Sequence, residues 1–130
     1  MSDMLPKLFF KHFTNTSFII EKENEIVGFI IGFCSQSIQN EAYIHFVGVH
    51  PGFRKDGIAR KLYEAFFEVV KGMGVNKVSC VTSPINKTSI AYHTKMGFIC
   101  QRGDIEVDGI PVHVDYDGQG GDRVVFMKEI

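Results

Sequence analysis

The stretch Val47–Arg60 combines residue types that could hold an anion. It reads Val-Gly-Val-His-Pro-Gly-Phe-Arg-Lys-Asp-Gly-Ile-Ala-Arg and runs from an apolar strand pattern through a glycine-containing loop into a helical pattern. A helix that begins directly after such a loop directs several backbone N–H groups and its positive end at one place, which suits a pyrophosphate. The small Gly57 and Ala59 would let a phosphate approach the backbone, and positive charge could come from Arg54, Lys55 and Arg60. The alternative is an ordinary turn between a strand and a helix, and the patterns GxxxxGK[ST] and GxGxxG are both absent.

The elements that must position this stretch can be predicted from the spacing of apolar residues. Runs rich in β-branched and aromatic residues predict strands, whereas apolar residues three and four apart predict helices. The predicted strands are Phe18–Glu23, Glu25–Cys34, Ala42–Val49, Val75–Thr82, Phe98–Gln101 and Val124–Lys128, with a strand excursion over Ile105–Val114. The predicted helices are Leu5–Phe13, Ile58–Met73 and a segment capped by Asn86 that stops at Gly97. Strands that first pair as a hairpin and then alternate with helices favour an α/β (α+β) fold, a mixed sheet with helices on both faces.

The composition indicates one small globular domain in a reducing compartment. The chain has 130 residues, a formal net charge of −1 and 45% hydrophobic residues, so we expect a single domain over residues 1–130 with its own core. The near-zero charge argues against nucleic-acid binding, and no apolar run reaches the roughly 18 residues of a membrane span. The chain start lacks a secretion signal, and the three cysteines are too far apart for a CxxC pair. We therefore expect reduced thiols, no metal and a cytoplasmic location.

Two motifs resemble the GNAT acetyltransferase superfamily. Arg-x-x-Gly-x-Ala at residues 54–59 is similar to the family signature [Q/R]-x-x-G-x-[G/A], whose loop holds the pyrophosphate of acetyl-coenzyme A. Asn-x-x-Ser at residues 86–89 with Lys-Met-Gly-Phe at residues 95–98 resembles the second family motif, a helix that begins at Asn and ends in Gly-Phe. The motifs stand in the family's order, separated by the expected helix and strand. The resemblance spans about residues 18–97 and implies a GNAT-like, mainly antiparallel β-sheet flanked by helices, with a splayed central strand pair.

The resemblance also implies a site for acetyl-CoA. In the family, the pantetheine arm inserts beside the central strand, at positions that match Val47, Gly48 and Val49, and backbone groups there could polarise the thioester carbonyl. The pyrophosphate would lie on the backbone amides of Lys55, Asp56, Gly57, Ile58 and Ala59, with Arg54 and Arg60 nearby. Asn86 would face the pantetheine arm from the second helix.

The same resemblance makes two histidines and one tyrosine the catalytic candidates. Many family members have a tyrosine five residues before the Phe of Gly-Phe that is thought to protonate the departing thiolate. That place holds His93 here, with Tyr92 before it, so His93 is the first candidate for the acid and Tyr92 the second. The alternative for His93 is a surface helix residue that only contacts the cofactor. His45 on the central strand is the candidate base for the acceptor amine, and its alternative is a satisfied core histidine; ordered water could also serve as the base.

The chain departs from the family at its front. Family members normally begin with a strand and a helix that form one wall of the acceptor site, and we expect the chain to be too short for them. Residues 18–23 would then be an open sheet edge, which a homodimer could cover. The acidic segment 104–122 would favour cationic acceptors, although Asp-Gly pairs such as Asp108–Gly109 also suit a solvated loop.

Taken together, the sequence predicts an N-acetyltransferase. The acetyl group would pass from acetyl-CoA to a primary amine, on a small molecule or a peptide, by direct attack in a ternary complex, without nucleic-acid or membrane partners. Two alternatives stay open: a catalytically silent acyl-CoA-binding sensor or regulatory module, and a domain that binds the phosphates of another nucleotide.

Overall fold

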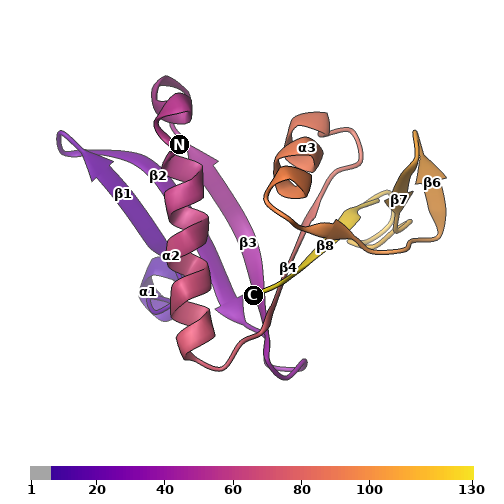
Figure 1. Cartoon of the computed structure of the whole chain (residues 1–130), viewed down its shortest axis with the longest axis horizontal. Coiled ribbons are helices and arrows are strands. Elements are labelled where there is room, and N and C mark those ends of the chain that lie inside the picture. The colour runs from indigo at the N-terminus through magenta and orange to yellow at the C-terminus, as the bar shows by residue number, and fades with distance from the viewer. Residues whose placement is uncertain (1–6) are drawn as a thin grey trace. The chain divides into compact units, whose positions relative to one another are not determined.

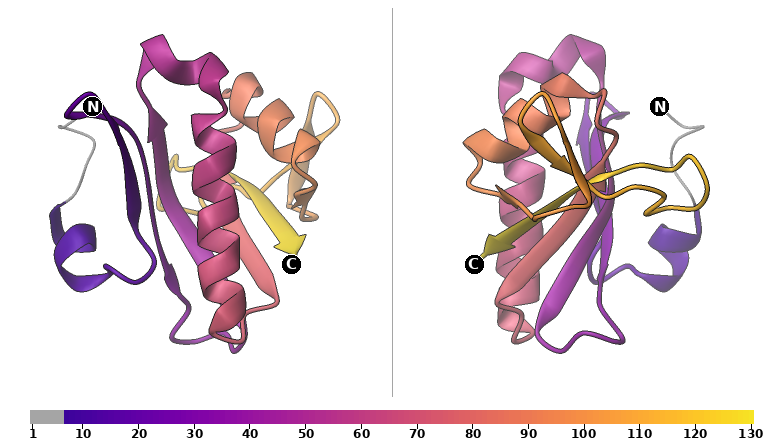
Figure 2. Two further views of the ribbon diagram at one scale, coloured as in Figure 1. Left: turned by 60° about the vertical axis from the view of Figure 1, so that its left-hand side comes forward. Right: turned by 90° about the vertical axis from the view of Figure 1, so that its right-hand side faces the viewer.

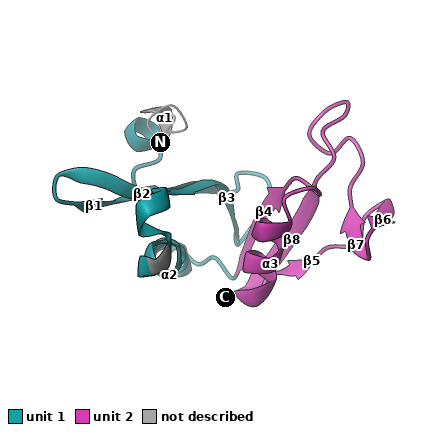
Figure 3. Cartoon of the chain, turned by 90° about the horizontal axis from the view of Figure 1, so that it is seen from above, with its two compact units in different colours: residues 1–76, 130 teal, residues 77–129 magenta. Residues whose placement is uncertain are grey.

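The computed structural model describes residues 7–130, with the side chains of all of these except residues 7–9 and 55. They form two compact units (Figure 3). The first holds the described residues up to Asn76 together with Ile130, and the second holds Lys77–Glu129. The predicted helix Leu5–Phe13 begins outside the described residues, and the rest of it is α1 (Lys7–His12). From residue 7 onward, no helix is both long and apolar enough to cross a membrane.

The first unit is built on an antiparallel sheet (Figure 1). β1 (Phe18–Lys22), β2 (Glu25–Cys34) and β3 (Glu41–Val49) pair in chain order. Glu23 and Asn24 both have positive φ and form the tight turn of the β1–β2 hairpin, so that Lys22 is paired with Glu25. β2 and β3 run from the pair Cys34–Ala42 to the pair Gly28–Val49, which places the end of β3 beside the start of β2.

Two glycines of β2 allow helix α2 (Ile58–Gly72) to lie close against the sheet. A Cβ atom at Gly28 would come 2.5 Å from Cγ2 of Ile58, and one at Gly32 would come 2.6 Å from Cε2 of Phe66. The buried side of α2 consists of Ile58, Leu62, Tyr63, Phe66 and Val70. The predicted apolar stripe of this helix is therefore confirmed over most of its length, but Met73, at its end, is 49% exposed.

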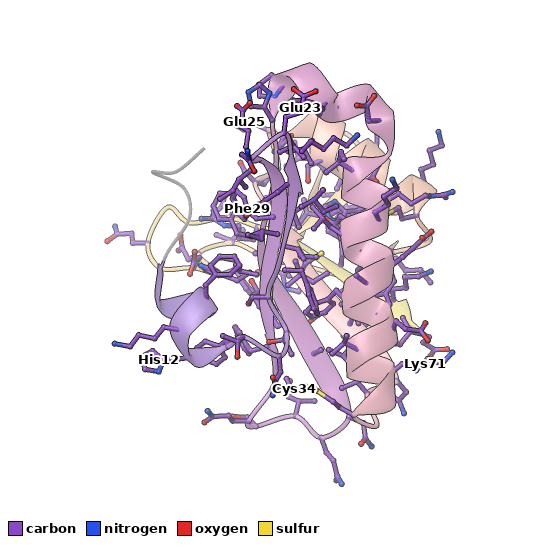
Figure 4. The ribbon with its side chains drawn as sticks, turned by 90° about the vertical axis from the view of Figure 1, so that its left-hand side faces the viewer. His12, Glu23, Glu25, Phe29, Cys34 and Lys71 are labelled. Atoms are coloured by element: carbon purple, nitrogen blue, oxygen red, sulfur yellow. The ribbon has the colours of Figure 1, made fainter. Side chains whose placement is uncertain are left out.

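Helix α1 covers the opposite face of the same strands (Figure 4). Phe10 and Phe13 pack against a core cluster of Phe29 and Ile31, which Phe33 and Phe46 complete. Thr16 and Ser17, between α1 and β1, attach this part of the chain to β2. The hydroxyl of Thr16 donates to the carbonyl oxygen of Gly32, and the N–H of Gly32 donates to the hydroxyl oxygen of Ser17. Both hydroxyl side chains are buried, and both are satisfied by these bonds.

The second unit is a smaller antiparallel sheet with one helix. β8 (Val124–Glu129), yellow in Figure 2, pairs with both β4 (Lys77–Thr82) and β5 (Ile99–Cys100). Helix α3 (Lys87–Lys95) precedes β5. The predicted excursion Ile105–Val114 is a hairpin of β6 (Ile105–Val107) and β7 (Ile110–Val112), turned at Asp108 and Gly109 with positive φ. Every pairing within the two units is antiparallel, so the predicted mixed α/β fold with a mainly antiparallel sheet and flanking helices is confirmed.

Candidate active site

The last residues of β3 are held tightly against β2. Val47, Gly48 and Val49 pair with Ile30, Phe29 and Gly28 in turn. Gly48 leaves no room for a side chain, because a Cβ atom there would lie 2.5 Å from Cε1 of Phe29. The backbone predicted to bind pantetheine is therefore fixed in position by its neighbouring strand.

A short 3-10 helix, η2 (Pro51–Asp56), occupies the place where the sequence predicts a loop. His50 holds its start: the His50 N–H donates to the carbonyl oxygen of Val27 at 2.7 Å, and its Nδ1 accepts from the N–H of Gly52 at 3.0 Å. The other ring nitrogen, Nε2, lies 3.4 Å from a carboxylate oxygen of Glu25. Proline at the first position favours this turn because its missing N–H would have no partner there.

Gly57 joins η2 to α2 in a conformation that favours glycine. Its φ of 71° and ψ of 20° are left-handed, and it ends η2 and begins α2 at once. No side chain caps α2 at this point, and its first turn contains no acidic residue. The first bond of the α2 ladder runs from the N–H of Lys61 to the carbonyl oxygen of Gly57, so the N–H groups of residues 58–60 lie at the open end of the helix. A Cβ atom at Gly57 would meet no atom within 4 Å among the described residues.

The charges around this helix end are partly paired. Nζ of Lys22 lies 3.5 Å from Oδ2 of Asp56 and 5.6 Å from the ring centre of Phe53. Arg60 faces Glu64 one turn on at 4.0 Å, and Arg54 is exposed. The predicted residues from Val47 to Arg60 thus come together in one unit, at an uncapped helix end with open space in front of it. Such an end suits an anionic group.

His45 lies at a β-bulge in β3. Phe46 pairs with Ile31 and Ile44 pairs with Gly32, so His45 is the extra residue between two pairs. It is exposed, whereas its neighbour Ile44 is buried, and its ring meets the edge of Phe46 at 6.4 Å. A bulge redirects the side chain at that point, which accounts for the exposure of His45.

The remaining predicted site residues belong to the second unit, on α3. Asn86 caps this helix, since its side-chain oxygen accepts from the N–H of Ser89 at 3.1 Å. Tyr92 is half-buried, with its ring edge-on to His93 at 6.2 Å. His93 itself is only 9% exposed and stacks on Phe126 with ring centres 4.9 Å apart.

The protonation state of His93 follows from its surroundings. Its Nδ1 lies 2.8 Å from the carbonyl oxygen of Ser89 and 3.2 Å from the hydroxyl oxygen of the same residue. Because a carbonyl oxygen can only accept, the shorter contact assigns the proton to Nδ1, which donates it. Burial lowers the pKa of His93 from its usual value, although the bond to Ser89 acts in the opposite direction. At neutral pH the ring is therefore uncharged, and its Nε2 is an acceptor.

The acidic segment between β5 and β8 is largely engaged in its own turns. Asp104 accepts from the N–H of Val114, Asp115 from that of Gly120, and Asp122 from that of Asp115. Asp117 pairs with Arg123 at 3.2 Å, and Asp108 with Lys87 at 3.1 Å. These bonds favour the solvated-loop interpretation over a free carboxylate surface.

A pocket of about 510 Å³ beside this segment is lined by Cys100, Arg102, Gly103, Asp104, Ile105, Glu106 and Pro111. No group of three or more potential metal ligands occurs among the residues from 7 onward.

Sequence reasoning missed the residues that support η2. The capping role of His50 is not predicted above, and the available signal is the proline that follows it, because proline is typical of the first position of a helix. Lys22 and Glu25 carry no local signal, because the residues they contact are distant in the chain.

Comparison with known proteins identifies the family. The model of the acetyltransferase (GNAT) family matches residues 2–98. The L-2,4-diaminobutyric acid acetyltransferase of Vibrio parahaemolyticus is 31% identical over 85 residues, which are 65% of this chain and 47% of that protein. Ard1 of Thermoplasma volcanium superposes with a TM-score of 0.76 at 19% identity, covering 94% of this chain and 75% of that one. A chain of the NatC complex bound to Gag peptide and CoA gives a TM-score of 0.73 at 18% identity, over 95% of this chain and 77% of that one.

This chain belongs to the GNAT acetyltransferase family, because the family model matches well over half of it. The fold agrees with that of the solved relatives. The chain spans about half the length of the diaminobutyrate enzyme that it matches.

Proposed function

We propose that this chain is an acetyl-CoA-dependent N-acetyltransferase that acts on a primary amine by direct transfer. The observation that carries the proposal is the helix end at Gly57: among the described residues it has neither a capping side chain nor an acidic first turn, and there is open space before it. A diphosphate fits this place, because it would accept from the N–H groups of residues 58–60 and add charge where the helix end is positive. Family membership and the CoA bound in the NatC complex support the choice of coenzyme A.

Bound acetyl-CoA would supply a thioester carbonyl as the acyl donor. The backbone of Val47–Val49 is rigid against β2 and would hold the pantetheine arm, so that its amides can polarise that carbonyl. The exposed His45 would take a proton from the amine, directly or through water. No covalent acyl-enzyme is needed, and Cys80 is poorly suited to form one, because burial raises the pKa of its thiol to about 12.

The proton for the departing thiolate would come from α3. The neutral His93 has its proton on Nδ1, bonded to Ser89, and offers only a lone pair at Nε2. The hydroxyl of Tyr92 is a hydrogen-bond donor, so Tyr92 is the better donor chemically. We place Tyr92 ahead of His93 in this role.

The test of the cofactor site compares two substitutions of nearly equal shape. Asp and Asn both tolerate left-handed backbone, so Gly57→Asp and Gly57→Asn differ mainly in charge. We expect Gly57→Asp to weaken coenzyme A binding at least about 100-fold, and Gly57→Asn about tenfold or less, in calorimetric titration. Equal affinities for both variants and for the natural protein would place the diphosphate elsewhere.

A second candidate function is an acyl-CoA-binding sensor without turnover. The burial of His93 at the place of the usual tyrosine favours it. Release of free thiol from acetyl-CoA separates the two functions. The amine panel should include L-2,4-diaminobutyrate, its decarboxylated analogue 1,3-diaminopropane and a peptide with a free N-terminus. A sensor would bind coenzyme A and release thiol with none of them.

A further inference from the structure

The tip of the β1–β2 hairpin contacts the 3-10 helix that precedes α2. Figure 4 shows Glu23 and Glu25 at this tip, at the same end of the unit as η2. Two side chains bridge the elements: Lys22 reaches Asp56 at 3.5 Å and lies over the ring of Phe53, and Glu25 reaches His50 at 3.4 Å. The hairpin register pairs Lys22 with Glu25, so both contacts come from adjacent places on the two strands.

Asp56 creates an electrostatic problem at this site. It stands directly before Gly57, and its side chain is 47% exposed. A carboxylate close to the start of a helix is attracted to the same positive end that would bind a diphosphate. An unpaired Asp56 would therefore compete with the cofactor and repel it.

We propose that Lys22 is a positioning residue for the cofactor diphosphate. By pairing with Asp56 it neutralises the carboxylate and holds it toward the hairpin, away from the open end of α2. The contact with the ring of Phe53 fixes the ammonium group on η2. This inference rests on the proposed function, and it assigns Lys22 an effect on cofactor affinity without contact to the cofactor.

A double-mutant cycle tests the inference. Coenzyme A is titrated calorimetrically into the natural protein, Lys22→Gln, Asp56→Asn and the double variant at low salt. We expect Lys22→Gln to raise Kd roughly two- to fivefold, the range of an exposed ion pair, and Asp56→Asn to lower Kd, because it removes the carboxylate that opposes the diphosphate. In the Asp56→Asn background, the effect of Lys22→Gln should disappear, because no carboxylate remains to be neutralised.

Three controls define what is measured. Lys71→Gln makes the same charge change at the far end of α2, about 20 Å along the helix, and should not alter Kd. Dephospho-coenzyme A keeps the diphosphate and lacks the 3′-phosphate, so it should show the same cycle. In turnover with acetyl-CoA, Lys22→Gln should raise KM and leave kcat unchanged, and this difference should shrink as salt is added.

The outcomes separate the inference from the proposed function. If the double variant binds as weakly as Lys22→Gln alone, Lys22 touches the phosphates directly and the positioning role is overturned. An unchanged Kd for Lys22→Gln overturns it as well. A natural protein that does not bind coenzyme A at all removes the proposed function itself.

Discussion

The stacked rings of His93 and Phe126 show how one helix residue can serve the core and lose its charge. The face-on contact at 4.9 Å excludes water from most of the imidazole, and the carbonyl of Ser89 holds its single proton. An imidazolium in this place would lose hydration, which is why burial lowers the pKa of His93.

The stability of the protein should therefore fall on mild acidification. The unfolded chain binds a proton at His93 near pH 6.5, whereas the folded chain resists it, so the stabilising contribution is complete above that pH and is lost as pH falls toward the lowered pKa. His93→Phe keeps an aromatic ring on Phe126 and removes the titrating group. We expect its Tm to fall less than that of the natural protein between about pH 7.5 and pH 5.5. Parallel curves for both proteins would contradict the assignment.

Single substitutions can also test which residue donates the proton to the thiolate in the proposed reaction. Tyr92→Phe removes a hydroxyl, and His93→Phe removes an imidazole that has no transferable proton on Nε2 when neutral. We expect Tyr92→Phe to lower kcat about 100-fold with little change in the KM for acetyl-CoA, as loss of a general acid does. His93→Phe should lower kcat much less. A large loss of kcat in His93→Phe alone would return the role to His93.

At the scale of elements, the contact between β2 and α2 decides where the helix begins. Gly28 lies under Ile58, the first residue of α2, and Ile58 follows Gly57 directly. The close approach of the strand and the helix therefore also fixes the proposed cofactor site. A glycine in a strand usually weakens it, and here the absence of a side chain is what permits the packing.

Gly28→Ala should disturb stability and binding together. The new Cβ atom would stand 2.5 Å from a branched methyl of the fully buried Ile58, so the helix must shift. We expect a loss of about 1–3 kcal/mol of unfolding free energy in urea and a weaker affinity for coenzyme A. Gly72→Ala, at the other end of α2 with nothing within 4 Å, is the matched control and should be neutral or slightly stabilising. A Gly28→Ala protein as stable as the control would refute this account.

For the whole molecule, local patterns predicted most elements, and long-range contacts account for most of what they missed. The strands, α2 and the Asn86 cap follow from alternation, helical spacing and capping residues, which act within a few positions. The Lys22–Asp56 pair depends on how a hairpin meets a distant helix. The burial of His93 is not predicted, because histidine as a residue type suggests the surface. The available signal is its position three residues after Ile90, which places both residues on the same face of α3.

The predicted site residues divide between the two units. Those from Val47 to Arg60 gather around the start of α2, whereas Asn86, Tyr92 and His93 lie on α3 of the second unit. Their predicted roles, the single domain over residues 1–130 and the homodimer stay predictions. The family could be predicted because two short motifs and the order of elements agree, and no single motif would have been specific enough.

The uncapped start of α2 would have a metabolic consequence if the proposed function holds. It would hold the diphosphate, a part of the molecule that is identical before and after the acetyl group has left. Binding at this place cannot distinguish acetyl-CoA from the free coenzyme A that is left after transfer. The two molecules would therefore compete for the same site with similar affinity. The rate of such an enzyme would depend on the ratio of acetyl-CoA to free coenzyme A. An excess of free coenzyme A would slow the enzyme even when acetyl-CoA is abundant.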